Sequence, residues 1–305
     1  MNHLRITTAE LAKICGVSQG TVDRALNNRA DINPETKQRI INAAKQYGFR
    51  EDVDSTTEIK TAGQIGIIVF NLNNEYFSKL ITETELILRE LNFSAVIMMT
   101  HYDKQYEIEC IRNMYNMGVQ GIIICSVNSG EEFNNYLKLF NIPIVAVGNN
   151  IGSVPYVGID DYAAMRDMTE KLIAEGYTDF IYFSPAVNYE DAYAQKLRYQ
   201  GFLSAVSGRR HKLITDISGI EETYGDKTAI ICSTDYYAFK VYSKAKNAKI
   251  VGFDNLDAID NYNLNIDSVG YSVSEIAKSA LEIIVGKRDG GAVVSHSIVE
   301  HKATD

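Results

Sequence analysis

Residues 5–50 read RITTAELAKICGVSQGTVDRALNNRADINPETKQRIINAAKQYGFR, and this stretch decides the fold of the N-terminal part of the chain. Thr7 and Glu10 form a T-x-x-E capping box, which predicts the start of a helix. Gly16 is placed to end that helix, because glycine tolerates the positive φ found after helix ends. Ser18 caps a second helix, and an Asn-Pro pair opens a third. The pattern predicts three short helices with a tight turn between the first two, which is a helix-turn-helix.

A helix-turn-helix places its second helix in the major groove of DNA, with the N-terminal residues aimed at base edges. Gln19 can read adenine through two hydrogen bonds, and Arg24 can reach guanine or a phosphate. The candidate DNA-contacting residues, taking base and phosphate contacts together, are Thr7, Ser18, Gln19, Gly20, Thr21, Arg24, Asn27 and Thr36. The alternative is a plain helical bundle, but the long pattern A-x-x-x-G-V-S-x-x-T-V-x-R-x-L-N with its correct caps favours DNA binding.

Positive charge is concentrated in this N-terminal stretch. Residues 1–50 hold 8 Lys and Arg against 4 Asp and Glu, whereas the whole chain of 305 residues has a formal net charge of −9. A basic head on an acidic body is typical of a small phosphate-contacting module joined to a larger part that avoids DNA. The length suits about two domains, each with its own core.

The rest of the composition indicates a reducing compartment and no cofactor. The four cysteines are widely spaced beside apolar runs, which favours buried free thiols; they are Cys15, Cys110, Cys125 and Cys232. The five histidines show no ligand spacing, and no nucleotide-binding or hydrolase motif is present. There is no signal-peptide pattern and no apolar run of ~20 residues. We therefore expect a cytoplasmic protein that is not an enzyme and has no cofactor, metal or membrane contact.

From residue 64 onward, short apolar runs rich in β-branched residues alternate with amphipathic segments. The runs predict strands at 64–70, 94–100, 119–126, 142–148, 178–184, 211–217, 228–234, 248–254 and 295–302. The segments between them predict helices at 76–91, 104–117, 131–140, 162–175, 191–206, 236–244 and 272–286. This alternation predicts two doubly wound parallel sheets in series, with the chain crossing between lobes near 157–160 and 265–272. A ligand would bind in the cleft beyond the carboxyl ends of the strands.

Residues 6–50 resemble the headpiece of the LacI/GalR family of bacterial repressors. Five motifs extend the resemblance over the body: NNEYFSKL, VGIDDYAAM, LRYQGFLSAV, STDYYAF and VGFDNL. The resemblance implies an all-α helix-turn-helix headpiece followed by an α/β, periplasmic-binding-protein-like core of two lobes. It also implies a sequence-specific regulator, expected to be a repressor, that binds palindromic operator DNA as a homodimer. A small-molecule effector between the lobes would change its affinity for DNA.

The expected domain boundaries follow from the same resemblance. Residues 1–50 form the headpiece, 51–63 the linker and 64–305 the core. The core divides into an N-lobe, about 64–158 plus 270–288, and a C-lobe, about 159–266 plus 291–305. In the family the linker holds a hinge helix with a leucine wedge that kinks DNA. This linker is acidic and has only Ile59 as a wedge, so we expect a disordered tether and a less strongly bent operator.

The effector candidates combine motif positions with residues at strand ends. They are Tyr76, Phe77, Asn149, Asp160, Arg198, Asp235, Asp254 and Tyr271, with Tyr189 and Tyr193 as further aromatic candidates. The resemblance implies effector contact for the positions of Asp160, Arg198 and Asp254. Helix capping is an equal alternative for Asp160 and Asp235, and a surface ion pair is the alternative for Arg198. Trp is absent, so any stacking on a ligand must come from Tyr or Phe.

A sugar or sugar derivative is the favoured effector, because Arg and Asp side chains can bind neighbouring hydroxyls while an aromatic ring covers the C–H face of the sugar. The alternatives are a nucleobase or a phosphorylated metabolite as the effector, or a solute-binding sensor that is not exported.

Overall fold

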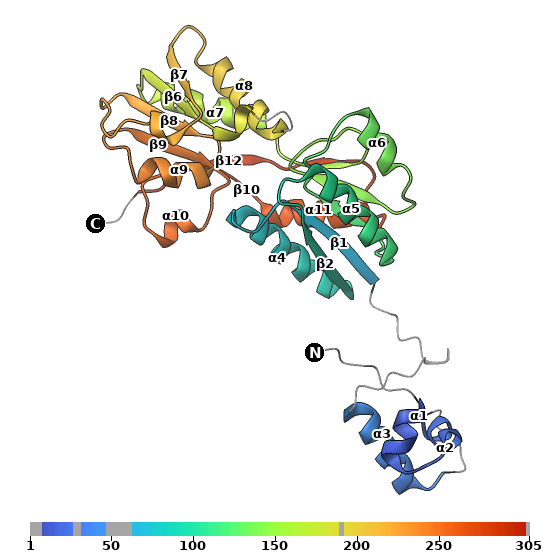
Figure 1. Ribbon diagram of the computed structural model, residues 1–305. Coiled ribbons are helices and arrows are strands. Elements are labelled where there is room, and N and C mark those ends of the chain that lie inside the picture. Colours follow the sequence, from blue (N-terminus) through green and yellow to red (C-terminus); the bar gives the residue numbers. More distant parts are fainter. Residues whose placement is uncertain (1–7, 27–31, 47–62, 189–191, 303–305) are drawn as a thin grey trace. The chain divides into compact units, whose positions relative to one another are not determined.

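The computed structural model describes residues 8–26, 32–46, 63–188 and 192–302 (Figure 1). The chain divides into two compact units, Met1–Lys60 and Thr61–Asp305, which we call the head and the body. The predicted linker lies outside the described residues except for Gly63, which begins the first strand of the body.

The head consists of α1 (Thr8–Cys15), α2 (Gln19–Leu26) and α3 (Pro34–Gln46), so the three predicted helices are confirmed. Its core is small and closely packed: Leu11, Val22 and Ile40, one from each helix, are fully buried. Gly16 has a φ of +63°, which is the conformation that the turn between α1 and α2 was expected to require. Three helices held by one shared apolar cluster form a unit with a core of its own.

The body contains two six-stranded sheets, and we call the lobe around the first the N-lobe (Figure 1). Its strand order is β11-β5-β4-β3-β1-β2, and every pairing is parallel. The strands are β1 (Gly63–Val69), β2 (Phe93–Met99), β3 (Ile122–Ile124), β4 (Ile144–Val147), β5 (Tyr156–Gly158) and β11 (Ala292–Val293). The helices are α4 (Glu75–Glu90), α5 (Lys104–Asn116), α6 (Glu131–Leu137) and α11 (Val273–Ile284).

The second sheet belongs to the C-lobe and has the order β12-β10-β9-β8-β6-β7. Its strands are β6 (Asp179–Phe183), β7 (Arg210–Ile214), β8 (Thr228–Cys232), β9 (Lys249–Phe253), β10 (Asp267–Tyr271) and β12 (His296–Val299). The helices are α7 (Asp161–Ala174), α8 (Tyr193–Ala205), α9 (Asp235–Tyr242) and α10 (Ala258–Asn261), with short 3₁₀ turns at Pro185–Asn188 and Ile217–Gly219. The edge strand β12 pairs antiparallel to β10, and the other pairings are parallel.

All nine strands and seven helices that the sequence predicts for the body are present, with ends shifted by at most three residues. The predicted periodicity is confirmed by burial: the last five residues of β1 and all five of β8 are buried. Strands covered by helices on both faces are expected to be apolar throughout, as these are.

The lobe boundary near the C-terminus differs from the expected one. Residues 291–305 were assigned to the C-lobe, but Ala292 and Val293 pair with Val157 and Gly158 in the N-lobe sheet. The chain therefore crosses between lobes a third time, between β11 and β12. Residues that follow strands of both sheets line one cleft, so the carboxyl ends of both sheets face it.

Candidate functional site

The helix-turn-helix positions its candidate side chains through local hydrogen bonds. The Ser18 hydroxyl accepts from the Thr21 amide at 3.2 Å and lies 2.8 Å from the Thr21 hydroxyl, which fixes the start of α2. Gln19 and Gly20 follow in the exposed first turn. Arg24, one turn later, is exposed and its Nε donates to the Gly20 carbonyl at 3.1 Å.

The other DNA candidates are placed less completely. Thr36 lies in the first turn of α3 and is half-buried. Thr7 and Asn27 lie outside the described residues. The described part of α2 therefore presents one amide side chain and one guanidinium from an exposed surface, which is the chemistry needed to contact base edges and phosphates.

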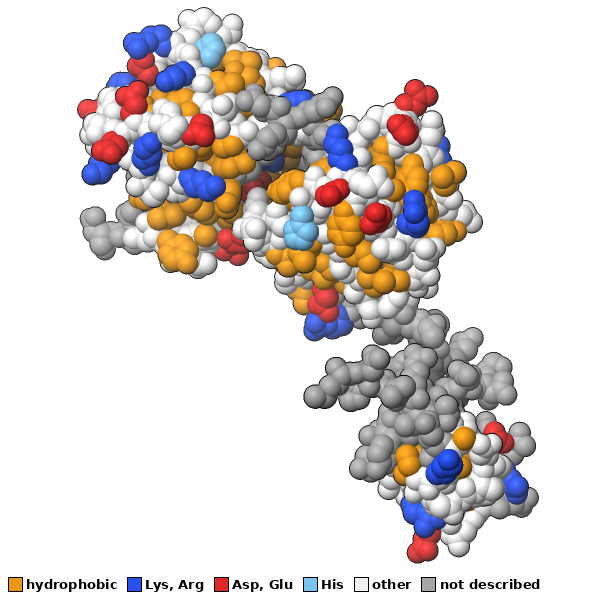
Figure 2. Space-filling model, viewed as in Figure 1, with side chains coloured by type: hydrophobic (Ala, Val, Ile, Leu, Met, Phe, Trp, Pro, Cys, Tyr) orange, Lys and Arg blue, Asp and Glu red, His pale blue; other side chains and the backbone are white. Residues whose placement is uncertain are grey.

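A cleft of about 980 Å³ lies between the two lobes of the body. Figure 2 shows hydrophobic side chains on both lobes beside the hollow that separates them. The N-lobe contributes the asparagine-rich loop after β1, including Asn71 and Asn73, and the C-lobe contributes Gln195 and Arg198. Apolar and aromatic walls with a few convergent polar groups are typical of small-molecule sites.

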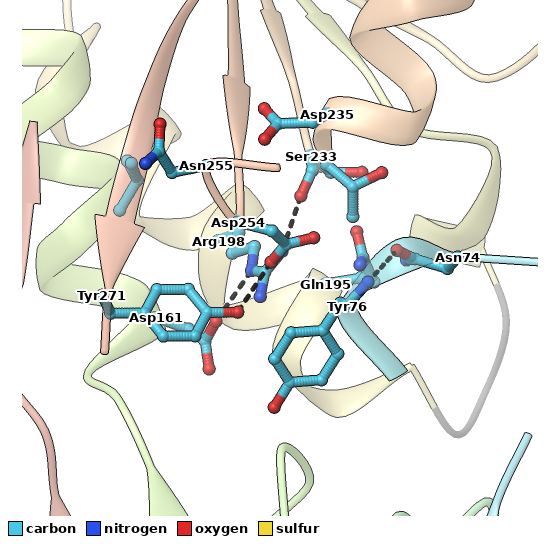
Figure 3. A network of polar contacts seen from close by, with 12 residues as sticks. Asn74, Tyr76, Asp161, Gln195, Arg198, Ser233, Asp235, Asp254, Asn255 and Tyr271 are labelled. Carbon is cyan, nitrogen blue, oxygen red and sulfur yellow. Dashed lines mark hydrogen bonds and ion pairs between the residues drawn. The ribbon is translucent and has the colours of Figure 1, made fainter. Parts of the chain in front are cut away.

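Arg198 is the centre of the polar cluster in this cleft (Figure 3). It is only 7 % exposed, although it lies on α8. Its Nε donates to Asp161 at 2.7 Å, and its Nη1 donates to the Ser233 carbonyl at 2.7 Å and lies 3.6 Å from Asp254. The guanidinium carbon sits 3.5 Å from the centre of the Phe253 ring. Arg198 is thus a buried residue of the cleft wall in a fixed orientation, and the surface ion pair is excluded. Its contact with an effector remains a prediction.

The cation of Arg198 and the carboxylates of Asp161 and Asp254 stabilise each other's charged forms. Burial opposes the charge of Arg198, but the neighbouring Asp161 and Asp254 raise its pKa above the ordinary value. Burial raises the pKa of Asp161, and the bond from Arg198 acts against that rise. One cation shared by two buried carboxylates leaves little positive charge for a further anion.

Asp254 lies at the end of β9 in a strained conformation, with a φ of +105°. Its carboxylate accepts from the Tyr271 hydroxyl at 2.8 Å (Figure 3). Burial raises the pKa of Asp254 from 3.8 to about 6, while Arg198 and Tyr271 oppose that rise. The pKa of Asp254 therefore lies nearer to neutral pH than that of an ordinary aspartate.

This pKa has a measurable consequence for stability. A carboxyl whose folded pKa exceeds its unfolded pKa adds stability below the unfolded value, and loses it as pH rises through the folded value. Relative to Asp254→Asn, the wild type is expected to lose up to about 3 kcal/mol of unfolding free energy between about pH 4 and pH 7. Urea denaturation of both proteins across this range measures the difference. If the unfolding free energies of the two proteins changed with pH in parallel, the raised pKa of Asp254 would be wrong.

Aromatic side chains form one wall of the cleft. Tyr76 and Phe77 follow Asn74, whose side chain accepts from the Tyr76 amide at 3.0 Å and so starts α4. The Tyr76 ring lies 5.2 Å from Phe77 and 6.1 Å from Tyr271, which belongs to β10 in the other sheet. These three predicted residues line the cleft together.

Asn149 lines the cleft and joins the lobes. Its amide nitrogen donates to the Ser126 carbonyl of the N-lobe at 2.9 Å, and its oxygen accepts from the Ala194 amide of α8 at 3.3 Å. Both ends of the carboxamide are therefore used within the protein. Its expected ligand contact remains a prediction, and the structure adds an interlobe contact that the sequence did not suggest.

Asp160 and Asp235 do not belong to the lining of the cleft. Asp160 is exposed and caps α7 by accepting from the Ala163 amide at 2.9 Å, so the capping alternative describes its position. Asp161, the next residue, points to Arg198 instead. Asp235 is fully buried and accepts from the Leu256 amide and the Ser268 hydroxyl, at 2.8 and 2.7 Å. It holds the loop after β9 rather than a ligand.

Sequence reasoning missed several lining residues. Asp161 is the second aspartate of the VGIDDYAAM motif, which contains both aspartates but does not show which of them faces the cleft. Asn71 and Asn73 lie in the N-L-N-N loop between a strand and a helix, which is itself a signal for a polar ligand contact. Among the further aromatic candidates, Tyr193 is 46 % exposed and outside the lining, and Tyr189 lies outside the described residues.

The four cysteines are free and buried, as predicted. Within the described residues, no group of three or more His, Cys, Asp or Glu side chains is arranged to hold a metal ion. Nor does any described helix have the length and apolar character needed to cross a membrane.

Comparison with known proteins agrees with this geometry. Residues 62–233 match the family described as periplasmic binding proteins and the sugar binding domain of the LacI family, and residues 7–52 match the bacterial regulatory proteins of the lacI family. Catabolite control protein A of Priestia megaterium is 25% identical over 97% of this chain and 96% of its own length. The sucrose operon repressor of Staphylococcus xylosus is 21% identical over 96% of this chain and 95% of its own length.

Solved structures share the fold. The lac repressor dimer bound to operator and an anti-inducer has a TM-score of 0.71 at 16% identity, covering 98% of this chain and 99% of that one. A complex of the transcriptional regulator CelR with cellobiose has a TM-score of 0.62 at 17% identity, covering 98% and 100%. With one family match spanning more than half of the residues and a second on the head, the chain belongs to the LacI family of bacterial regulatory proteins.

Proposed function

We propose that this protein is a repressor that binds a palindromic operator as a homodimer and changes its affinity when a sugar-type effector occupies the interlobe cleft. The observation that carries the proposal is the buried Arg198–Asp161–Asp254 cluster, open to a cleft with aromatic walls, in a chain that also has a helix-turn-helix head. Such a protein acts in the cytoplasm, where the bacterial chromosome lies.

The cleft suits a neutral, hydroxyl-rich ligand better than an anion at its centre. The Arg198 guanidinium is already paired with two carboxylates, which would repel a phosphate. The same carboxylates accept hydrogen bonds from hydroxyls, and Asn73 and Gln195 add carboxamides to the lining. The alternative of a phosphorylated metabolite is supported by Lys104 and Lys240, which also line the cleft.

Two sets of bonds between the lobes offer a route from effector to DNA. Asn149 joins the N-lobe to Ala194, and Asp257 of the C-lobe meets Glu75 and Lys79 of α4. The Lys79–Asp257 ion pair is 2.7 Å long and exposed, so it is easily exchanged for water. A ligand that favours one lobe arrangement shifts the population of the two, and a two-fold dimer converts that shift into a different spacing of its heads.

Two measurements on the intact protein test this function. Fluorescence anisotropy at low ionic strength measures binding to palindromic duplexes. Thermal-shift screening compares the stabilisation that neutral sugars, sugar phosphates and nucleobases give. The expected result is operator binding that changes when a neutral sugar is added. If no palindromic duplex binds with or without these compounds, the proposal is wrong, and stabilisation by sugar phosphates alone would favour the alternative effector.

Replacing Gln19 with alanine is expected to weaken binding to the cognate operator roughly 10-fold, because one bidentate base contact is worth about 1–3 kcal/mol of discrimination. Binding to unrelated duplex should change little, since phosphate contacts dominate there. Gln38→Ala is the matched control, because Gln38 is an exposed glutamine of the same head that pairs with Asn42 on α3. Equal loss of affinity in both variants would contradict the role of Gln19.

A further inference from the structure

A row of aromatic rings runs from the polar centre of the cleft to its N-lobe edge. Tyr271, Tyr76 and Phe77 are joined by centroid distances of 6.1 and 5.2 Å. Phe77 then meets Phe70 at 5.2 Å, and Phe70 stacks on Tyr102 at 4.8 Å with an interplanar angle of 25°. All five side chains line the same cavity. The outer pair, Phe70 and Tyr102, therefore continues the wall of the predicted ligand site beyond the residues around Arg198.

The sheet brings the outer pair together. Phe70 follows β1 and Tyr102 follows β2, and these two strands pair in parallel along their whole length. The His101 amide donates to the Phe70 carbonyl at 2.8 Å, which ties the two strand ends together. A ring pair held by adjacent strand ends is a preorganised surface for a ligand.

Tyr102 is maintained in an unfavourable backbone conformation. Seven described residues other than glycine have positive φ; four of them are Asn, which tolerates it, and a fifth is the strained Asp254. Tyr102, at +64°, is a bulky exception, and its neighbour His101 is at +52°. Its side chain is nevertheless 58 % exposed, so burial of the ring does not explain the strain. Strained residues concentrate at ligand sites, and here the strain presents a ring at the cleft.

The size of the cavity agrees with a second ligand position. Drug-sized ligands occupy pockets of about 300–1,000 Å³, and this cleft measures about 980 Å³. The C-lobe also supplies an exposed aromatic side chain to the lining, Tyr236, which is 40 % exposed. A single sugar ring bonded to Arg198 and Asp254 would leave the outer aromatic part of the cleft unfilled.

We propose that Phe70 and Tyr102 form an outer subsite that stacks on a second sugar ring, so that the effector is a neutral disaccharide or longer saccharide. The inner sugar ring binds to Arg198 and Asp254, and the outer sugar ring stacks on the ring of Tyr102. This assignment rests on the proposed function, because it concerns the effector of the same cleft.

Isothermal titration of the intact protein tests the subsite with glucose, fructose, maltose, cellobiose, trehalose and sucrose as probes. At least one disaccharide is expected to bind 10-fold or more tightly than either of its component monosaccharides. Tyr102→Ala should reduce the affinity for that disaccharide to the monosaccharide level and leave monosaccharide affinity unchanged. Tyr262→Ala is the control, because Tyr262 is 74 % exposed and outside the cleft lining.

Tyr102→Trp guards against misfolding as an explanation. The chain has no tryptophan, so this variant carries a single tryptophan at the proposed subsite, whose emission can be excited selectively. It should retain disaccharide affinity, and its emission should shift on addition of disaccharide but not of monosaccharide. Equal affinities for monosaccharides and disaccharides, or an unaffected Tyr102→Ala variant, would overturn the subsite and leave the proposed function intact. If none of the saccharides bound, both the subsite and the sugar-type effector would be wrong. Operator binding would then still test the function of the head separately.

Discussion

Replacing Arg198 with alanine is expected to reduce the unfolding free energy of the body by about 3–5 kcal/mol, because it leaves buried carboxylates without their cation. Asp161 is 3 % exposed and Asp254 is 7 % exposed, so water cannot replace the guanidinium easily. The Ser233 carbonyl also loses its donor. The same variant should lose its response to effector, since the side chain lines the cleft.

A surface arginine provides the matched control for this prediction. Arg166 lies on α7, pairs with Asp167 at 2.8 Å and has a side chain that is 39 % exposed, so Arg166→Ala should cost far less stability than Arg198→Ala. A double variant, Arg198→Met with Asp161→Asn, should be more stable than Arg198→Ala because one buried charge is removed with its partner. Urea denaturation measures all three. Similar losses for Arg198→Ala and Arg166→Ala would contradict the buried-cluster account.

Of the residues that the sequence predicted for the effector, Arg198 and Asp254 line the cleft, whereas Asp160 does not and its neighbour Asp161 does. Asp160 and Asp161 are adjacent, and both follow a strand and precede a helix. Which of them caps the helix depends on the backbone angles at the junction, and Asp160 takes that role with a φ of −82° and ψ of 87°. No local pattern distinguishes the two, because the choice is set by the position of Arg198 on a different helix.

The parts of the fold that the sequence did not predict are short or depend on distant partners. β5 has three residues and β11 has two, too few to show the periodicity that identifies a strand. β11 exists because Ala292 and Val293 meet β5, more than a hundred residues earlier in the chain. The outer aromatic pair is similar, since Phe70 and Tyr102 become neighbours only when β1 and β2 pair in register. The longer strands were predicted well, because a strand that is buried on both faces shows a continuous apolar run in its own sequence.

Gly201 is expected to be intolerant even of alanine, with a loss of about 3 kcal/mol of unfolding free energy. A Cβ added to Gly201 would overlap the backbone carbonyl oxygen of Tyr162 on α7 and approach the Arg166 amide to 3.1 Å. Backbone atoms of a packed helix cannot move aside as a side chain can, so α7 and α8 must separate. The glycine of the LRYQGFLSAV motif is therefore explained by the close contact of two helices.

Two physical effects predict opposite signs for the change in unfolding free energy of Gly201→Ala. Helix propensity alone would make Gly201→Ala stabilising by about 1 kcal/mol, because glycine is a poor residue in a helix interior. Steric overlap predicts the opposite sign. Ser204→Ala, an exposed position of the same helix, should change stability by no more than about 0.5 kcal/mol. Because Arg198 lies one turn before Gly201 on α8, the variant should also weaken effector binding in titrations under conditions where it is folded. A Gly201→Ala protein as stable as the wild type would show that the contact between α7 and α8 is looser than described, and would remove the reason for glycine at this position.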